Sequence, residues 1–247
     1  MSAIQKARLD ALTALGRYPK LFHSIASIGS NRSTLVRPTT GLCIEAPPRS
    51  GNSFFVTGFS MANPTVQLAH HHHVPAQVLR AISLQVPVVV LLRNPVDSSL
   101  AKAAPGMEPF LIGTTLARWI SFWQVVKDSL TSTVAVPFEY LISNPAGVIS
   151  RLNGAFGTFF SVSFPESRLV FEEMERGRLA KLGRISAEKP NPNIPSSQIA
   201  AKEELLRSYA HKHSRAKAAM GLYRELSARL APLWVLPEEP SKGNSLS

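Results

Sequence analysis

The sequence predicts a single α/β domain in which helices cover both faces of a central parallel sheet. Three short runs are almost continuously apolar, as strands buried on both faces must be, and helical stretches separate them. The chain has 247 residues, of which 45% are hydrophobic and 17% charged, so it can bury one core and is not a disordered tail. This alternation of strand and helix favours a three-layer α/β/α architecture.

Four segments fit the strands of this sheet. They are 41–46, 86–92 and 133–138, with a weaker fourth at 66–70. Each run is far shorter than the ~20 apolar residues that a bilayer-spanning helix needs, so no membrane span is predicted.

Helices are predicted from their caps and from their periodicity. Asn94 and Asn144 each precede a proline, which is typical of an N-cap residue followed by the first helical position. Apolar stripes at helical spacing predict long helices over 110–130 and 197–230. Prolines and asparagines predict an irregular loop over 183–197.

Three parts are expected along the chain. Residues 1–40 read as an N-terminal helix and polar loop, 41–236 as the domain, and 237–247 as a flexible tail. The basic, acid-poor N-terminus also has the composition of an organellar transit peptide, although a helix is the preferred interpretation. The single cysteine, Cys43, excludes an internal disulfide and suits a reducing compartment, so we expect a cytoplasmic protein.

Positive charge is concentrated in the first part of the chain. The net charge is +11, and residues 1–102 carry ten Lys or Arg against three acids. Such an excess suggests an anionic ligand, which by composition alone could be nucleic acid, a membrane surface or a phosphorylated cofactor.

The segment after the first predicted strand is suited to binding an anion. A turn at Gly51 leads into a helix near Asn52, and the backbone N–H groups at such a helix start attract phosphate or sulfate. Arg49 adds a cation in the same loop. The loop is not a Walker A motif, because no Lys-Ser or Lys-Thr pair follows the glycine.

A second cation stands at the end of the strongest predicted strand. Arg93 precedes the Asn94 cap, and Ser98 and Ser99 lie in the first turn of the following helix. Ligands of open α/β sheets bind at the carboxyl ends of strands, so two anion sites are expected side by side there.

Four consecutive histidines, 70–73, follow the weaker strand. Neighbouring residues on a strand point to opposite faces, so at most alternate histidines are expected to converge. No Cys, Asp or Glu lies nearby to complete a zinc site, and no metal is predicted.

Three of these segments resemble motifs of the sulfotransferase family, in the same order. Residues 48–54 resemble its 5′-phosphosulfate loop, 93–97 its 3′-phosphate motif, and 136–145 the strand and helix start after its middle helix. The resemblance covers about residues 41–160. It implies a fold like that of P-loop NTPases and 3′-phosphoadenosine 5′-phosphosulfate (PAPS) as co-substrate, with no metal required.

The resemblance also implies roles for individual residues. His73 aligns with the family's catalytic base and His71 with its lysine, while Phe54 stands where an aromatic ring stacks on adenine or packs in the core. The implied PAPS-binding residues are Arg49, Ser50, Gly51, Asn52, Ser53 and Phe54 at the 5′ end, and Arg93 with Ser98 or Ser99 at the 3′ end.

The sequence departs from the family pattern at four places. The family's Tyr-Glu-Asp appears here as Phe138, Glu139 and Tyr140, with the loss of one hydroxyl group. Asn52 stands where the family has a hydroxyl residue, and Ala101 stands where it has a 3′-phosphate serine. The late basic clamp has only a weak counterpart at 181–184.

The leading hypothesis is therefore a PAPS-dependent sulfotransferase acting on a hydroxyl of a small molecule or carbohydrate. Its acceptor and oligomeric state are not encoded in any recognisable motif. Three rivals remain: a phosphoryl-transfer enzyme of P-loop type, a basic nucleic-acid-binding module, and a family member that binds nucleotide without turnover. Nucleic acid is the weaker choice of partner, because the motif arginines stand singly at strand ends.

Overall fold

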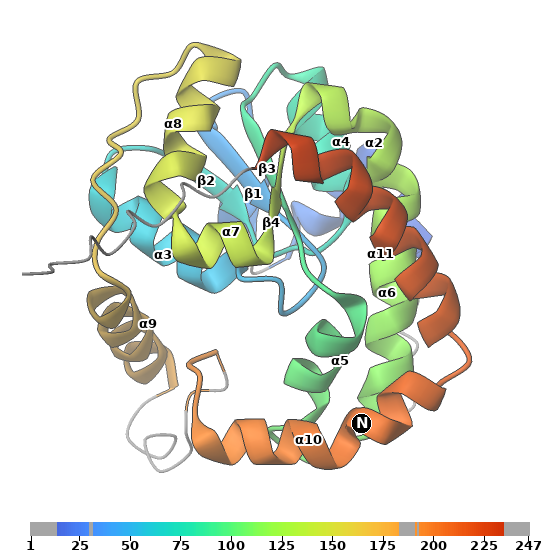
Figure 1. The fold of residues 1–247 in the computed structure, drawn as a ribbon. Helices are drawn as coiled ribbons and strands as arrows, with labels where there is room; N and C mark the ends of the chain where they lie inside the picture. The colour runs from blue at the N-terminus through green and yellow to red at the C-terminus, as the bar shows by residue number, and fades with distance from the viewer. Residues whose placement is uncertain (1–13, 30–31, 183–190, 192, 235–247) are drawn as a thin grey trace, which may run out of the picture.

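A central parallel sheet organises the protein (Figure 1). The computed structural model describes residues 14–29, 32–182, 191 and 193–234. The strands run in the order β2-β1-β3-β4, and all neighbouring pairs are parallel. Their bounds are Leu42–Glu45 (β1), Leu68–His70 (β2), Val88–Leu92 (β3) and Val134–Pro137 (β4). All four predicted strands are confirmed, each slightly shorter than its apolar segment.

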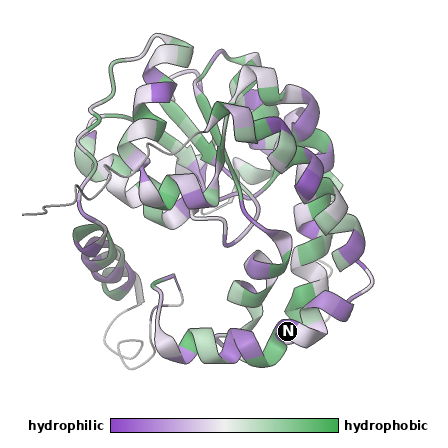
Figure 2. Cartoon of the chain, in the orientation of Figure 1, coloured by the Kyte–Doolittle hydropathy of each residue, from purple (hydrophilic) through white to green (hydrophobic). Residues whose placement is uncertain are grey.

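The strands contribute side chains to two apolar clusters on opposite faces of the sheet. On β1, Leu42 and Ile44 pack into one cluster, whereas Cys43 packs into the other. Helices cover the first face with α3 (Asn52–Ala62) and α8 (Pro145–Phe156), and the second with α4 (Pro75–Ser83), α5 (Pro95–Ala103), α6 (Phe110–Val126) and α11 (Ala216–Leu230). The predicted α/β/α architecture is confirmed. Figure 2 shows the strands as hydrophobic, with hydrophilic residues on the helices around them.

Asparagine caps begin two of these helices, as predicted. Asn94 Oδ1 accepts a hydrogen bond from the backbone N–H of Val96 at 2.9 Å. Asn144 Oδ1 accepts one from the N–H of Gly147, also at 2.9 Å. Each bond satisfies an N–H group that has no partner within the helix. The short helix α7 (Phe138–Ser143) joins β4 to α8.

Two predicted helices differ from the observed ones. The segment 110–130 is α-helical only to Val126 and continues as the 3₁₀ helix η2 (Lys127–Ser132). The segment 197–230 is two helices, α10 (Ser197–Lys212) and α11, so the single long helix was wrong. His213 turns extended between them (φ −64°, ψ 134°) and packs on α6, where a Cβ at Gly113 would lie 2.4 Å from its Nε2.

Helix α9 (Ser167–Leu182) has no counterpart in the sequence analysis. It is hydrophilic over most of its surface (Figure 2), so it lacks the apolar stripe that predicts a helix. It contacts α3 through Val170 and Met174, which pack against Phe54. The last element of the described residues is η4 (Ala231–Leu233).

The N-terminal part contains α2 (Pro19–Ala26) and the turn η1 (Arg32–Thr34). Phe22 anchors α2 by packing on Val74 and Ala76. The start of the predicted N-terminal helix, most of the loop 183–197 and the tail 237–247 lie outside the described residues. Among the described helices, none combines the length and apolarity needed to cross a bilayer.

Candidate functional site

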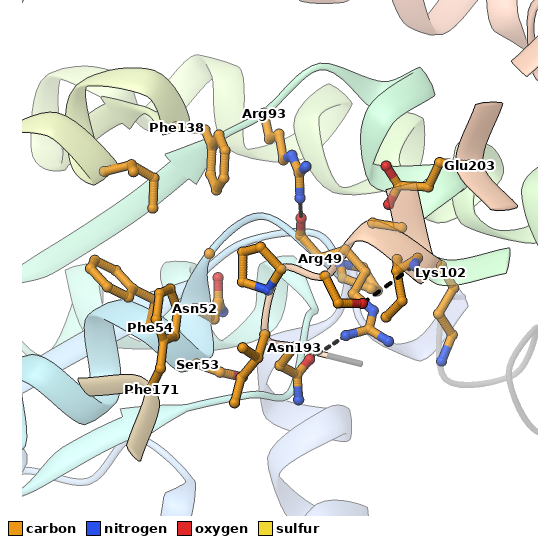
Figure 3. Close-up of a pocket in the computed structure, with 18 of the residues that line it drawn as sticks. Arg49, Asn52, Ser53, Phe54, Arg93, Lys102, Phe138, Phe171, Asn193 and Glu203 are labelled. Atoms are coloured by element: carbon orange, nitrogen blue, oxygen red, sulfur yellow. Dashed lines mark hydrogen bonds between the residues drawn. The ribbon is translucent and has the colours of Figure 1, made fainter. Parts of the chain in front are cut away.

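A cavity of about 600 Å³ lies at the carboxyl edge of the sheet. Its walls come from the β1–α3 loop, the turn after β2, the end of β3 and helices α5, α6 and α10 (Figure 3). The predicted site residues that line it are Arg49, Gly51, Asn52, Ser53, Phe54, His71, His73 and Arg93. Two motifs separated by more than forty residues thus meet at one edge, where open α/β sheets bind ligands.

The β1–α3 loop depends on left-handed backbone. Arg49 has φ 66° and Gly51 φ 95°. The conformation suits glycine, whereas for Arg49 it costs about 1–2 kcal/mol. A Cβ at Gly51 would also lie 3.2 Å from the Phe138 ring. No side chain caps α3, so its first backbone N–H groups bring the positive end of the helix dipole to the cavity.

Buried polar atoms at the start of α3 have no hydrogen-bond partner among the described residues. Asn52 is 4% exposed, and within the described part of the chain neither its Oδ1 nor its Nδ2 is hydrogen-bonded. The same holds for the hydroxyl of Ser50. An unsatisfied buried polar group costs about 1–3 kcal/mol, and most such groups in folded proteins are satisfied. A ligand with acceptor oxygens fits this end of the cavity, because Asn52 Nδ2 can donate to it.

The two motif arginines are locked together. Arg93 Nη1 donates to the Arg49 carbonyl at 2.7 Å, and its guanidinium lies 4.2 Å from the centre of the Phe138 ring. Trp119 Nε1 in turn donates to the Arg93 carbonyl at 3.0 Å. The Arg49 guanidinium donates to Asn193 Oδ1 (Figure 3). Both cations are therefore held at the cavity by packing and hydrogen bonds rather than left to solvent.

Two further cations line the cavity. Lys102 projects from α5 and Arg118 from α6. Burial lowers the pKa of Lys102, and the charges of Arg49 and Arg118 lower it further. Burial and the nearby Arg93 likewise lower the pKa of Arg49. Glu203 is the only acid among the described lining residues, so the cavity favours a ligand with several negative charges.

Only the first of the four histidines belongs to a strand, and the other three form a turn. β2 ends at His70, and both His71 (φ 64°) and His73 (φ 57°) are left-handed. Glu45 holds the turn, because its two carboxyl oxygens accept the N–H groups of His72 at 2.9 Å and His73 at 2.8 Å. Strand alternation therefore stops at His70, and the rings of His70 and His71 lie 4.6 Å apart, contrary to expectation. Within the described ranges, no group of three or more His, Cys, Asp or Glu side chains could hold a metal ion.

The hydrogen bonds of His73 define its chemistry. Its Nδ1 lies 2.8 Å from the carbonyl of Ala46, which can only accept, so Nδ1 carries the proton and Nε2 keeps a lone pair. Burial, with the charge of Arg118 as a smaller cause, lowers the pKa of His73 to about 3. The His71 Nε2 lies 3.1 Å from Ser53 Oγ.

The predicted serines of α5 lie beneath the cavity. Ser98 and Ser99 are fully buried, and neither is a lining residue. Ser99 Oγ donates to the Val96 carbonyl at 2.7 Å, while Ser98 Oγ has no partner among the described residues. One turn further along α5, Lys102 reaches the cavity instead.

Phe54 is 5% exposed and lines the cavity at the α9 side. Its ring centre lies 5.5 Å from that of Phe164 and 5.6 Å from that of Phe171. The ring thus packs in a small aromatic cluster and presents one part of its surface to the cavity.

Several lining residues were not predicted, among them Lys102, Arg118, Phe138 and Asn193. The sequence indicated only that Arg118 is not part of the core, because it lies off the apolar stripe of α6. The direction in which it points depends on how α6 packs, which no local pattern encodes.

Comparisons with known proteins add little to this geometry. No family model matches the chain, and no curated protein matches it significantly. Among solved structures, the crystal structure of mouse sulfotransferase SULT7A1 complexed with PAP is similar at a TM-score of 0.44 and 10% sequence identity. That match covers 80% of this chain and 92% of the mouse chain.

Proposed function

We propose that the protein is a sulfotransferase that transfers the sulfuryl group of PAPS to a hydroxyl of its acceptor. The observation that carries the proposal is the convergence of four cations on one cavity, whose described lining includes a single acid. The cations are Arg49, Arg93, Lys102 and Arg118. PAPS bears anionic groups at both ends of its nucleoside. A cavity whose cations come from separate strand ends and helices suits such a ligand.

Different residues bind the two anionic ends of the cofactor. Arg49 and the backbone N–H groups of 50–54 bind the 5′-phosphosulfate, and Asn52 Nδ2 donates to it. Arg93 and Lys102 bind the 3′-phosphate, whereas Ser98 and Ser99, the hydroxyl partners expected from the sequence, are buried and do not line the cavity. Charge-assisted hydrogen bonds of this kind are the stronger ones in proteins, and arginine is suited to phosphate geometry.

The transfer needs one base and fixed positive charge. The acceptor oxygen attacks sulfur in line, the bond between sulfur and the 5′-phosphate oxygen breaks, and the phosphate departs with the electron pair. Arg49 stabilises the charge that develops on the departing phosphate, so no metal is required. His73 Nε2 receives the hydroxyl proton, and His71 lies beside it to hold the acceptor oxygen.

The depressed pKa of His73 bears on this step. A base with a pKa of about 3 accepts a proton poorly at neutral pH. Burial is the main cause of the lowered pKa, and a bound polyanion opposes only the smaller contribution of Arg118, so it shifts the pKa of His73 upward.

The test measures binding and transfer separately. Binding of PAP, the desulfated product, is measured by isothermal titration calorimetry, and transfer by ³⁵S-labelled PAPS with a panel of hydroxylated acceptors. We expect Arg49→Ala and Arg93→Ala each to weaken PAP binding by about 10- to 100-fold, because each removes a charge-assisted contact. His73→Gln should retain PAP binding and lose transfer by about 10²-fold or more.

Arg224→Ala is the matched control, because this exposed arginine lies on α11 and does not line the cavity. PAP binding that survives both Arg49→Ala and Arg93→Ala would overturn the site. A preference for ATP with Mg²⁺ would instead indicate a phosphoryl-transfer enzyme. PAP binding without transfer to any acceptor would indicate a nucleotide-binding protein that has lost turnover.

A further inference from the structure

A second cavity of about 490 Å³ lies between α3 and α9. It shares three lining residues with the cationic cavity, namely Ser53, His71 and Asn193. The two cavities therefore meet at the start of α3 and at the turn that carries His71. A molecule in the second cavity has access at this boundary to a group bound in the first.

The second cavity differs from the first in its charge. Its charged lining residues are Glu173 and Arg178. Glu173 pairs with Arg176 at 2.6 Å, and Arg178 pairs with Glu175. Each charge among the described lining residues is thus compensated within α9, so these residues present no excess charge to attract an ionic ligand.

The α3 wall carries hydroxyl groups at helical spacing. Ser53, Thr57 and Ser60 lie at i, i+4 and i+7, which places them along one face of the helix. The hydroxyls of Thr57 and Ser60 make no hydrogen bond to any described residue, so they can both donate to and accept from a ligand.

Apolar side chains alternate with these hydroxyls. Val56 and Met61 of α3 and Met174 of α9 line the same cavity. A wall that combines several hydroxyls with apolar patches, and has no net charge, matches a neutral polyhydroxylated ring, whose edge is polar and whose faces carry C–H groups.

We propose that the cavity between α3 and α9 is the acceptor site, and that the acceptor is an uncharged polyhydroxylated compound of the carbohydrate class. This inference rests on the sulfotransferase function proposed above. One acceptor hydroxyl passes Ser53 and His71 toward His73, whose ring centre lies 5.9 Å from that of His71. Its oxygen forms the new bond to sulfur, its proton moves to His73, and the sulfur–phosphate oxygen bond breaks.

Gly177 of α9 offers a direct test of the site. It lines the second cavity but not the first, and a Cβ added to it meets no atom within 4 Å. The backbone at Gly177 therefore has room for a side chain, so Gly177→Phe is expected to place a ring in the acceptor site, and a helical position tolerates the change from glycine well. Gly221 of α11 is a matched control, because its Cβ also meets open space and it lines neither cavity.

The probes are lactose and methyl galactoside as neutral sugars, and 2-naphthol as a phenol, each with labelled PAPS. We expect wild type to sulfate the sugars. Gly177→Phe should raise the KM for lactose at least 10-fold while leaving the Kd for PAP within 2-fold of wild type. Gly221→Phe should change neither. Thr57→Val should raise the KM for lactose about 3- to 10-fold, since it removes one hydroxyl and keeps the shape.

The outcomes separate this inference from the function on which it rests. If wild type binds no PAP and transfers no label, the proposed function fails. If wild type transfers label and Gly177→Phe is equally active, the function stands and the acceptor site is wrong. If 2-naphthol is the better acceptor and Thr57→Val is silent, the carbohydrate class is wrong.

Discussion

A buried asparagine lies at each end of α3, and the two differ in their hydrogen bonding. At the C-terminal end, Asn63 is 8% exposed, and its Nδ2 donates to the carbonyls of Phe59 at 3.3 Å and Ser161 at 3.2 Å. Its Oδ1 accepts the Ser161 N–H at 2.7 Å. At the N-terminal end, Asn52 is buried as deeply, yet neither of its polar atoms has a described partner.

This difference in hydrogen bonding distinguishes a structural polar group, Asn63, from one that is suited to binding a ligand, Asn52. Asn63 ties a distant loop to the helix, and every bond it can usefully make is made. Asn52 lies beside a left-handed arginine, a left-handed glycine and two mutually repelling guanidinium groups. Strain, unsatisfied atoms and like charge thus accumulate at one end of a helix that is well satisfied at the other, as at sites whose complement is a bound molecule.

The largest effect is expected at the satisfied end. Asn63→Leu keeps the approximate size of the side chain but leaves the N–H and carbonyl groups of Ser161 without their hydrogen-bond partner. We expect the free energy of unfolding to fall by about 3 kcal/mol, because several buried hydrogen bonds are lost and their partners are left unpaired. Urea denaturation checks this, with Leu205→Ala, at an exposed position, as a control that should change little. A loss below 0.5 kcal/mol would contradict the comparison.

Glu45 extends the comparison to a third buried polar group. Burial raises its pKa to about 8, although the N–H groups of His72, His73 and Ala46 lower it. In the unfolded chain Glu45 loses its proton near pH 4.5, so from pH 6.5 to 8 only the folded state still holds that proton. Stability should therefore fall as pH rises through this window, by up to about 1.4 kcal/mol per pH unit and about 2 kcal/mol in all.

His73 has the opposite sign and a different window. Its pKa is lowered to about 3 from 6.5, so it penalises the folded state only below pH 6.5. Urea denaturation of wild type and Glu45→Gln from pH 6.5 to 8 isolates the carboxyl group. The slope should be smaller in the variant, and equal slopes would show that Glu45 is already ionised in the folded protein.

A smaller effect of opposite direction is expected at the unsatisfied end. Asn52→Leu removes two unpartnered buried polar atoms, and should raise the free energy of unfolding by about 1 kcal/mol. The same change should weaken PAP binding by about 10-fold, because it removes one donor to the phosphosulfate. Thermal denaturation and calorimetry measure the two effects. A destabilised variant that binds PAP normally would mean that Asn52 is a structural residue like Asn63.

The smallest expected effect concerns backbone strain. Arg49 has φ 66°, which glycine adopts freely and alanine does not. Arg49→Gly should therefore be more stable than Arg49→Ala by about 0.5–1 kcal/mol, while both lose the cation and bind PAP weakly. Parallel urea denaturation of the two variants makes the measurement. Equal stability would show that the loop relaxes once the arginine is removed.

Local sequence patterns predicted the strands of the sheet and part of the candidate site. Four apolar runs predict the four strands, and asparagine followed by proline predicts the starts of α5 and α8, because both signals involve residues close in the chain. The two motif arginines were also visible, since Arg93 directly follows β3 and Arg49 lies in the loop between β1 and α3. By contrast, α9 was missed because its hydrophilic surface has no apolar period.

The rest was decided by tertiary packing. The break between α10 and α11 follows from His213 packing on Gly113, about one hundred residues away in the sequence. The left-handed turn at His71 and His73 depends on hydrogen bonds to the carboxyl group of Glu45. Lys102 and Arg118 reach the cavity, while Ser98 does not, only because α5 and α6 pack on the sheet at particular rotations. A strand or cap is encoded by neighbours along the chain, whereas the convergence of side chains depends on contacts between segments that are distant in sequence.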